Sequence, residues 1–320
     1  MSLEAPAAPR RTAAFSHEAF LYKGTDQFTD AMASFLGEGI AAGEPALAVI
    51  DRSKIKALRR ALGRDAEAVT FEDTRAVGGN PARIIPVWQA FVDRFDHGRR
   101  MRGIGEPVWP GRTAAELLEC HQHEVLLNLA FERVPMRLVC PYDAEGLAGS
   151  VLDEAMCTHP FLLSGDRADD SPGYRSTKPR HALEGSLPEP EGPVLTFAIG
   201  TTLLAEMRRF VSDHATANGL RPSRTVDVTL AVNELATNSL VHGFGVPTLR
   251  CWTNGPTLVY EVSDYGSIAE PLVGRRIPST SAKDGRGLWL VNHLCDLVQL
   301  RSSATGTIVR VHMRRDGIPG

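Results

Sequence analysis

Several features are rare or missing in the sequence, and each absence excludes a class of protein. No run of about twenty apolar residues is present to span a bilayer, and the N-terminus lacks the apolar core of a signal peptide. The five cysteines are odd in number, scattered and without a Cys-x-x-Cys pair, which favours reduced thiols over a disulfide framework. A net charge of -3 gives no general reason to expect nucleic acid or an anionic membrane as partner. We therefore expect a cytoplasmic protein.

The glycine-rich segment in the first half of the chain is not a P-loop. The segment Gly37-Glu-Gly39-Ile-Ala-Ala-Gly43 is not followed by the Lys and Ser/Thr that bind phosphates in a P-loop. Nucleotide hydrolysis in this half is therefore not expected.

The composition indicates two domains. The chain has 320 residues, of which 43% are hydrophobic and 23% charged, enough to bury two sizeable cores. Residues 164–193 are rich in Pro, Gly and charge and predict a flexible linker. We expect a disordered N-terminus over residues 1–14, a first domain over 15–163 and a second domain over 194–316.

The two domains differ in pattern. The first alternates strand-like and helix-like stretches: strands at residues 46–50, 69–71 and 136–140, and helices at 55–62 and 84–95. This alternation favours an α/β fold with a mainly parallel sheet. In the second, helices over residues 201–217 and from Pro222 onward accompany strands at 194–199, 248–253, 258–262, 297–301 and 307–313. This order predicts an α+β sandwich with helices on one face of a largely antiparallel sheet.

Three motifs in the second domain indicate an ATP site. Glu234, Asn238 and His242 are spaced by four residues and project from one face of a helix. An amide oxygen suits Mg²⁺, and a carboxylate one turn earlier can take a proton from an attacking hydroxyl. Asp264, after an apolar strand, can accept a hydrogen bond from the exocyclic amine of adenine, and Gly266 lets the ring approach the backbone.

The third motif is Gly285-Arg286-Gly287-Leu288-Trp289, at the start of a predicted helix. Free backbone N–H groups at a helix start can hold phosphates, and Arg286 adds a positive charge. Each motif alone also fits a solvated helix face, a turn or an ordinary helix start. Their joint order within one segment of domain size favours the ATP site.

These motifs resemble the GHKL (Bergerat) ATPase superfamily, and within it the anti-sigma serine kinases of the RsbW type, over about Val194 to Met313. The resemblance implies that Glu234 is the general base, Asn238 the Mg²⁺ ligand and Asp264 the adenine reader, with Thr307 supporting Asp264 through a water. It further implies ATP-binding roles for His242, Gly266, Gly285, Arg286, Gly287, Leu288 and Trp289. One position departs from the family pattern Asp-x-Gly-x-Gly: Ile268 replaces the last glycine and narrows the room near the nucleotide.

The first domain resembles the MEDS sensory domain, a relative of RecA-like ATPases. The resemblance rests on His17-Glu-Ala-Phe-Leu-Tyr22, Phe35-Leu-Gly-Glu-Gly39, Gly43-Glu-Pro-Ala-Leu47 and Pro141-Tyr-Asp143. Chains that join both domains are similar to anti-sigma regulators of the RsbA type. This likeness implies an input domain with a small-molecule ligand. The segment Gly103–Gly111, which contains Trp109, either borders such a pocket or is a plain loop.

The leading hypothesis is a regulator of transcription in signal transduction, of the kind that acts in stress responses. The resemblance implies phosphorylation of Ser or Thr on a STAS-type anti-anti-sigma partner, sequestration of a sigma factor, and homodimerisation. One alternative is a GHKL binding module that acts by protein–protein interaction alone. Another is a histidine-kinase-like component, because Ser16-His17-Glu18 resembles a phosphoacceptor box, although the Arg-Thr-Pro continuation is missing.

A metal site in the first domain is a further alternative. The run Glu119-Cys-His121-Gln-His123-Glu124 offers ligands, with Cys140 or His17 as distant partners. Residues two apart on a helix point in nearly opposite directions, so His121 and His123 cannot both face one ion. We therefore favour a core cysteine and surface histidines.

Overall fold

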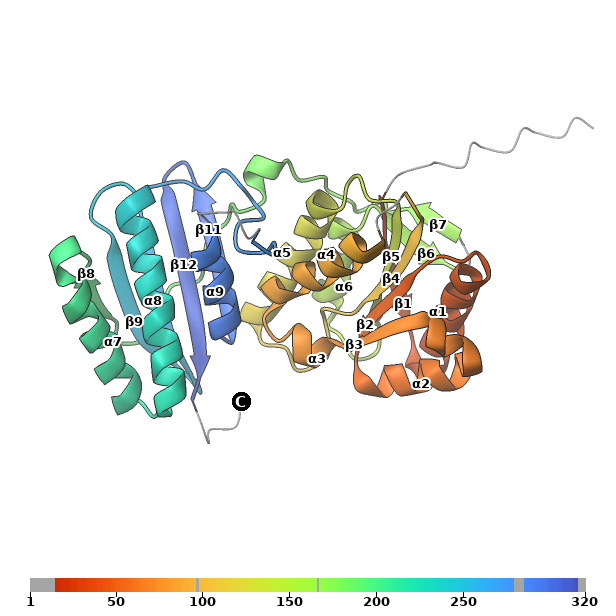
Figure 1. The fold of residues 1–320 in the computed structure, drawn as a ribbon, viewed down its shortest axis with the longest axis horizontal. Coiled ribbons are helices and arrows are strands. Elements are labelled where there is room, and N and C mark those ends of the chain that lie inside the picture. The colour runs from red at the N-terminus through yellow and green to blue at the C-terminus, as the bar shows by residue number, and fades with distance from the viewer. Residues whose placement is uncertain (1–14, 96–97, 166, 279–284, 316–320) are drawn as a thin grey trace, which may run out of the picture.

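The computed structural model describes residues 15–95, 98–165, 167–278 and 285–315. They form two domains, each built around its own sheet, which lie side by side (Figure 1). The predicted disordered N-terminus, residues 1–14, lies outside the described residues. None of the helices in the described part of the chain is long and apolar enough to cross a membrane.

The first domain is built on a seven-stranded sheet of order β3-β2-β4-β5-β1-β6-β7. All neighbouring strands pair in parallel except β6 and β7, which confirms the mainly parallel α/β prediction. Every residue of β2 and β4 is buried, as expected for parallel strands covered on both faces. The strands are β1 (Phe15–Tyr22), β2 (Ala46–Ile50), β3 (Val69–Asp73), β4 (Met101–Gly105), β5 (Met136–Asp143), β6 (Phe161–Ser164) and β7 (Arg167–Asp170).

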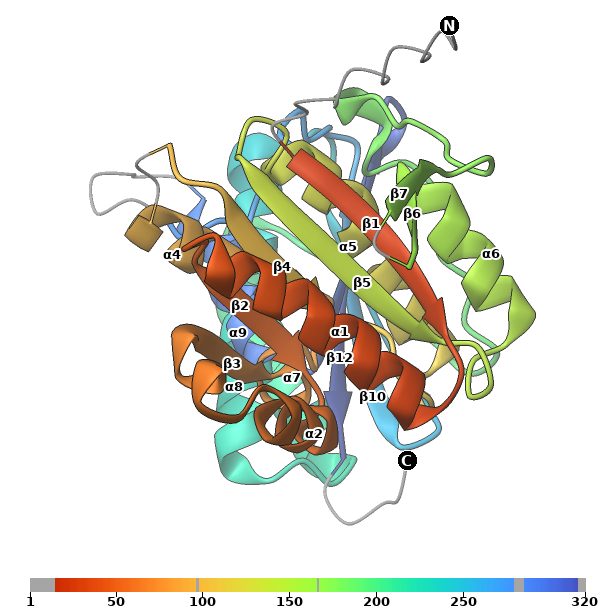
Figure 2. The same cartoon turned by 90° about the vertical axis from the view of Figure 1, so that its right-hand side faces the viewer.

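Helices cover both faces of this sheet. Helices α1 (Gly24–Ala41) and α2 (Arg52–Leu62) pack on one face, and α1 crosses in front of the sheet in Figure 2. The other face carries α4 (Ile84–Phe95), α5 (Ala114–Ala130) and α6 (Gly149–Thr158). Two short helices, α3 (Thr74–Val77) and η2 (Pro81–Arg83), precede α4, and η1 (Gly63–Ala68) follows α2.

Part of the segment Gly103–Gly111 is strand and not loop. Gly103 and Gly105 belong to β4, where a Cβ on Gly103 would lie 2.8 Å from the Trp88 ring. The glycine therefore serves the packing of Trp88 on the sheet. Trp109 lies after the strand, and the Arg112 guanidinium sits 3.5 Å from the centre of its ring.

The second domain has a five-stranded sheet of order β11-β12-β10-β9-β8, antiparallel at each pairing. Its strands are β8 (Leu195–Ala198), β9 (Thr248–Asn254), β10 (Thr257–Asp264), β11 (Leu297–Ser303) and β12 (Gly306–Arg314). Helices α7 (Leu204–Ala217), with η4 (Thr201–Leu203) before it, α8 (Pro222–His242) and α9 (Arg286–Leu294) cover one face. The predicted α+β sandwich is confirmed.

The predicted linker has more structure than its composition indicates. The first sheet continues through β7 to Asp170, beyond the predicted boundary at residue 163. A short helix, η3 (Pro179–His181), follows, and Leu183 is buried in the core of the second domain. The Leu183 carbonyl accepts from the Ser302 N–H, and the Pro188 carbonyl accepts from Arg310. A few buried leucines and main-chain hydrogen bonds therefore hold this segment against the second sheet.

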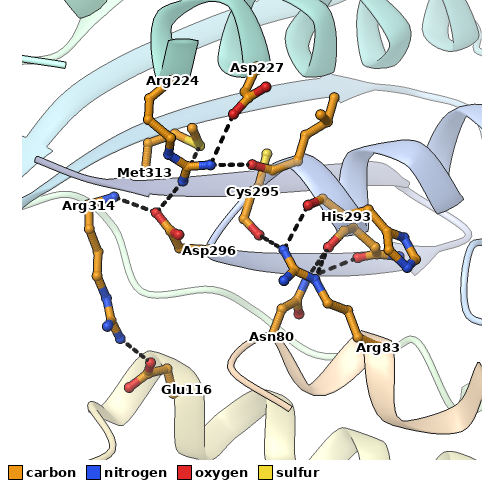
Figure 3. Close-up of polar contacts among 12 residues, drawn as sticks. Asn80, Arg83, Glu116, Arg224, Asp227, His293, Cys295, Asp296, Met313 and Arg314 are labelled. Atoms are coloured by element: carbon orange, nitrogen blue, oxygen red, sulfur yellow. Dashed lines mark hydrogen bonds and ion pairs between the residues drawn. The ribbon is translucent and has the colours of Figure 1, made fainter. Parts of the chain in front are cut away.

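Polar contacts join the domains at the C-terminal end of α9 (Figure 3). The Arg83 guanidinium donates to the carbonyl oxygens of Asn292, His293 and Cys295 at 2.7–2.9 Å. The Asn80 side chain donates to the same Asn292 carbonyl at 3.0 Å. Carbonyls at a helix C-terminus have no partners within the helix and attract positive charge. Arg83 thus stabilises the end of a helix that belongs to the other domain.

A buried carboxylate lies at the centre of the same interface. Glu119 of α5 contacts Arg301 of β11 at 2.8 Å and Arg275, which precedes α9, at 3.2 Å. All three side chains are almost fully buried, and burial lowers the pKa of Arg275. Arg301 also donates to Gln122 of α5 at 2.6 Å. Two arginine charges of the second domain therefore depend on one carboxylate of the first.

We expect Glu119→Gln to destabilise the protein by about 3 kcal/mol, because two buried guanidinium groups lose their counter-charge. The measurement is thermal and urea unfolding of the full chain. Glu67→Gln is the control, since Glu67 is exposed in η1. Equal stability of the two variants would contradict a structural role for the Glu119 contacts.

Candidate functional site

The second domain contains a cavity of about 420 Å³ between α8, the end of β10 and the start of α9. All of the site residues predicted from the three motifs line it, except Trp289. The predicted residues on its walls are Glu234, Asn238, His242, Asp264, Gly266, Gly285, Arg286, Gly287, Leu288 and Thr307. Segments that are far apart in the sequence thus meet at one place.

Trp289 does not line this cavity, and its role in ATP binding stays a prediction. Its side chain lines a different cavity, between the domains, together with Arg83 and Phe91. Its ring lies 4.0 Å from that of His293, centre to centre. Successive helical residues point about 100° apart, so Leu288 can face the first cavity while Trp289 turns toward the other domain.

The start of α9 lies directly against the polar face of α8. A Cβ on Gly287 would be 3.0 Å from Asn238 Nδ2 and 3.1 Å from Glu234 Oε2, so a larger residue would crowd both groups. Gly285, the N-cap residue, has a φ of 86° and no side chain to cap the helix. Backbone N–H groups at this helix start are therefore placed to bind an anion beside the amide and the carboxylate.

Asp264 is held in a fixed orientation at the end of β10. Its Oδ2 accepts from the Ser239 hydroxyl at 2.6 Å, and its Oδ1 accepts from the Gly266 N–H at 2.7 Å. A Cβ on Gly266 would lie 2.8 Å from Oδ1 and 2.9 Å from Gly243 Cα. The sequence prediction missed Ser239, although it follows Asn238 on the same helix.

Thr307 supports the backbone next to Asp264. It lies opposite Asp264 in the pairing of β10 with β12, and its hydroxyl donates to the Gly266 carbonyl at 2.9 Å. The Ser302 hydroxyl lies 2.9 Å from it and accepts from the Ile268 N–H. The Ile268 side chain lines the cavity and packs on the domain core.

Comparison with known families assigns both halves of the chain. Residues 16–160 match the model of MEDS, the methanogen/methylotroph, DcmR sensory domain, and residues 198–313 match that of the histidine kinase-like ATPase domain. The chain joins a MEDS domain to a histidine kinase-like ATPase domain. An ATPase domain of this family implies ATP binding.

No curated protein matches the chain significantly. Among solved structures, the crystal structure of the RsbU and RsbW domains of Rv1364c from Mycobacterium tuberculosis is 17% identical, with a TM-score of 0.30. The aligned region covers 38% of this chain and 32% of that one.

The MEDS domain contains a buried group of polar side chains whose ligand atoms lie close together. His17, Glu124, Cys140 and His159 are all buried and lie together. The metal alternative from the sequence included three of these residues. His159 was missed because it follows α6 and no local motif surrounds it.

Two other histidines of that alternative are not part of this group. His121 turns to the surface, where it pairs with Glu154 at 3.0 Å. His123 is buried but is not among the four grouped residues. The helix geometry separates them as expected, but the prediction of a surface histidine is wrong for His123, whose side chain is 1% exposed.

Burial controls the protonation of the group. Desolvation lowers the pKa of His17 to about 4 and that of His159 to about 3, and it raises the pKa of Glu124 and of Cys140. Both imidazoles are therefore neutral near pH 7. His17 is 1% exposed on β1, so its side chain is not presented to a kinase as a phosphoacceptor would be.

We expect Asn238→Ala and Asp264→Asn each to reduce the affinity for ATP with Mg²⁺ by roughly tenfold or more, because each removes one polar contact to the nucleotide or its ion. Calorimetric titration of the full chain measures this. Asn233→Ala is the matched control, since Asn233 lies on the same helix but pairs with Arg208 at the surface. Unchanged affinity in both site variants would place the nucleotide elsewhere.

Proposed function

We propose that the chain is an anti-sigma regulator. In this proposal the ATPase domain binds ATP with Mg²⁺, phosphorylates a Ser or Thr of a STAS-type anti-anti-sigma partner, and sequesters a sigma factor. The main support is the convergence of Glu234, Asn238, Asp264 and the start of α9 on one cavity.

Each of these groups has a chemical role in the proposal. Asn238 would hold Mg²⁺, which neutralises phosphate charge when bound. Glu234, four residues earlier on α8, would accept the proton of the partner's hydroxyl. Asp264, oriented by Ser239, would accept a hydrogen bond from the adenine amine. Arg286 and the N–H groups of α9 would offset charge on the phosphates.

The general base gives the sharpest test of kinase activity. We expect Glu234→Gln to lower phosphate transfer to a partner by roughly a hundredfold or more while ATP still binds, because the amide cannot take the proton. Transfer of labelled γ-phosphate and calorimetric titration measure the two properties separately. Asn233→Ala is again the control on the same helix. Transfer that persists in Glu234→Gln would remove the assigned base.

A binding module without phosphate transfer is the second candidate. The observation that favours it is Ile268, whose side chain lines the cavity where the family pattern has glycine. If ATP binds and the sigma complex forms, but no partner is phosphorylated, this candidate becomes the better account. Ile268→Gly would then be expected to increase nucleotide affinity.

The MEDS domain is placed to regulate the ATPase domain in this proposal. Arg83 holds the C-terminal end of α9, and the opposite end of this nine-residue helix lines the nucleotide cavity. The Asn292 side chain also donates to the Gly274 carbonyl, in the segment that precedes α9. A movement of η2 or α5 in the MEDS domain would therefore act on α9 and on that segment together.

We expect Arg83→Ala to weaken ATP binding several-fold, although residue 83 does not line the nucleotide cavity. The reason is that the last carbonyls of α9 lose their donor and their favourable charge. Arg64→Ala, at an exposed position of η1, is the control. Calorimetric titration of the full chain provides the measurement. Identical affinities in wild type and Arg83→Ala would argue against regulation through α9.

A further inference from the structure

The strongest feature outside the nucleotide cavity is the buried group of His17, Glu124, Cys140 and His159, which we name the HECH cluster. Its members come from β1, α5, β5 and the residue after α6. Each offers one ligand atom, and these atoms all lie within 4.8 Å of one another. We propose that the HECH cluster binds a divalent transition-metal ion, with Zn²⁺ as the best match.

The distances within the cluster fit a tetrahedral ion. His17 Nε2 lies 3.1 Å from Glu124 Oε2 and 3.4 Å from Cys140 Sγ. Glu124 Oε2 lies 3.6 Å from His159 Nε2 and 3.7 Å from Cys140 Sγ. With metal–ligand bonds of about 2.0–2.3 Å, the ligands of a tetrahedral zinc site are about 3.3–3.7 Å apart. Four of the six spacings are thus close to those of a bound ion, and the remaining two, from His159 to His17 and to Cys140, lie within 4.8 Å.

The surrounding hydrogen bonds aim both imidazoles at the same point. His159 Nδ1 lies 2.7 Å from the Ala155 carbonyl, which can only accept, so Nδ1 carries the proton. His17 Nδ1 faces Asn128 Oδ1 at 3.1 Å. Asn128 Nδ2 donates to two carbonyls, those of Glu124 and Thr158, which fixes its oxygen toward His17. Metal-binding histidines are usually oriented by such a bond from the second ring nitrogen.

With these tautomers, hydrogen-bond acceptors face one another inside the cluster. In the neutral rings, Nε2 of both histidines carries a lone pair, and both point toward the carboxylate oxygen of Glu124. Among the described residues, buried His159 Nε2 has no hydrogen-bond partner. The Cys140 thiol can donate to only one of its neighbours. A cation at the centre satisfies all four groups at once.

Charge and ligand type indicate the ion. A carboxylate from Glu124 and a thiolate from Cys140 together balance a divalent cation, so the buried site is neutral overall. Nitrogen, sulfur and oxygen donors in one tetrahedral set suit Zn²⁺ better than Mg²⁺ or Ca²⁺, which prefer oxygen alone. The Tyr142 hydroxyl donates to Glu124 Oε1 at 3.0 Å and leaves Oε2 for the ion.

A cavity next to the cluster marks the side from which an ion would approach. A cavity of about 310 Å³ between α5 and α6 is lined by Glu124, Tyr142 and Thr158. This cavity lies beside Glu124, which is itself 1% exposed. In this proposal an ion enters between α5 and α6, without separation of the sheet.

The test is metal analysis of the full chain, purified without a histidine tag, loaded with Zn²⁺ and then desalted. We expect one equivalent of zinc in the wild type and loss of most of it in Cys140→Ser and in His159→Gln. The controls are Cys157→Ser and His121→Gln, which alter the same residue types nearby but outside the cluster. Both controls should retain one equivalent.

A spectroscopic readout covers the case in which the site variants fail to fold. Wild-type protein loaded with Co²⁺ should show the visible bands of a tetrahedral ion and a near-ultraviolet thiolate charge-transfer band. A wild type that retains no zinc, or a Co²⁺ complex without the thiolate band, would overturn the proposal. So would full metal content in folded Cys140→Ser and His159→Gln proteins.

Discussion

The arrangement of the two domains depends on the buried carboxylate of Glu119. A charge removed from water must be matched by opposite charge and hydrogen bonds, and here both come from the neighbouring domain. Arg301 belongs to the edge strand β11, and Arg275 belongs to the segment between β10 and α9. That same segment supplies Ile268 and Val273 to the wall of the cavity in the ATPase domain. The contact that orients the domains therefore also positions part of the ATPase site.

Helix α9 connects the interface with the cavity of the ATPase domain, and its two ends have opposite electrical character. The N-terminal end, with Gly285 and Gly287, presents N–H groups to the cavity, and the C-terminal end presents carbonyls to Arg83. The helix has only nine residues, so most of its backbone groups belong to one end or the other. One end of the helix therefore contacts the MEDS domain and the other end lines the cavity.

The sequence predicted those parts of the structure that follow from local periodicity. Glu234 and Asn238 share a face because a helix repeats every 3.6 residues, and the strands of both sheets follow their apolar runs. The sequence did not predict that the Trp289 side chain lies between the domains, because tertiary packing decides which face of α9 meets the other domain. His159 was missed because its partners lie 142, 35 and 19 positions away in the chain, at residues 17, 124 and 140. Contacts of that kind have no local pattern.

Helix α5 joins the HECH cluster to the domain interface. Glu116, Glu119 and Gln122 recur every three residues and contact Arg314, Arg275 and Arg301 of the ATPase domain. Glu124 lies five residues beyond Glu119, about 140° further around the helix, and points to the opposite side. Because one rigid backbone carries both carboxylates, any rotation of α5 that moves Glu124 also moves Glu119. A ligand that fixes Glu124 therefore constrains the carboxylate on which the position of the ATPase domain depends.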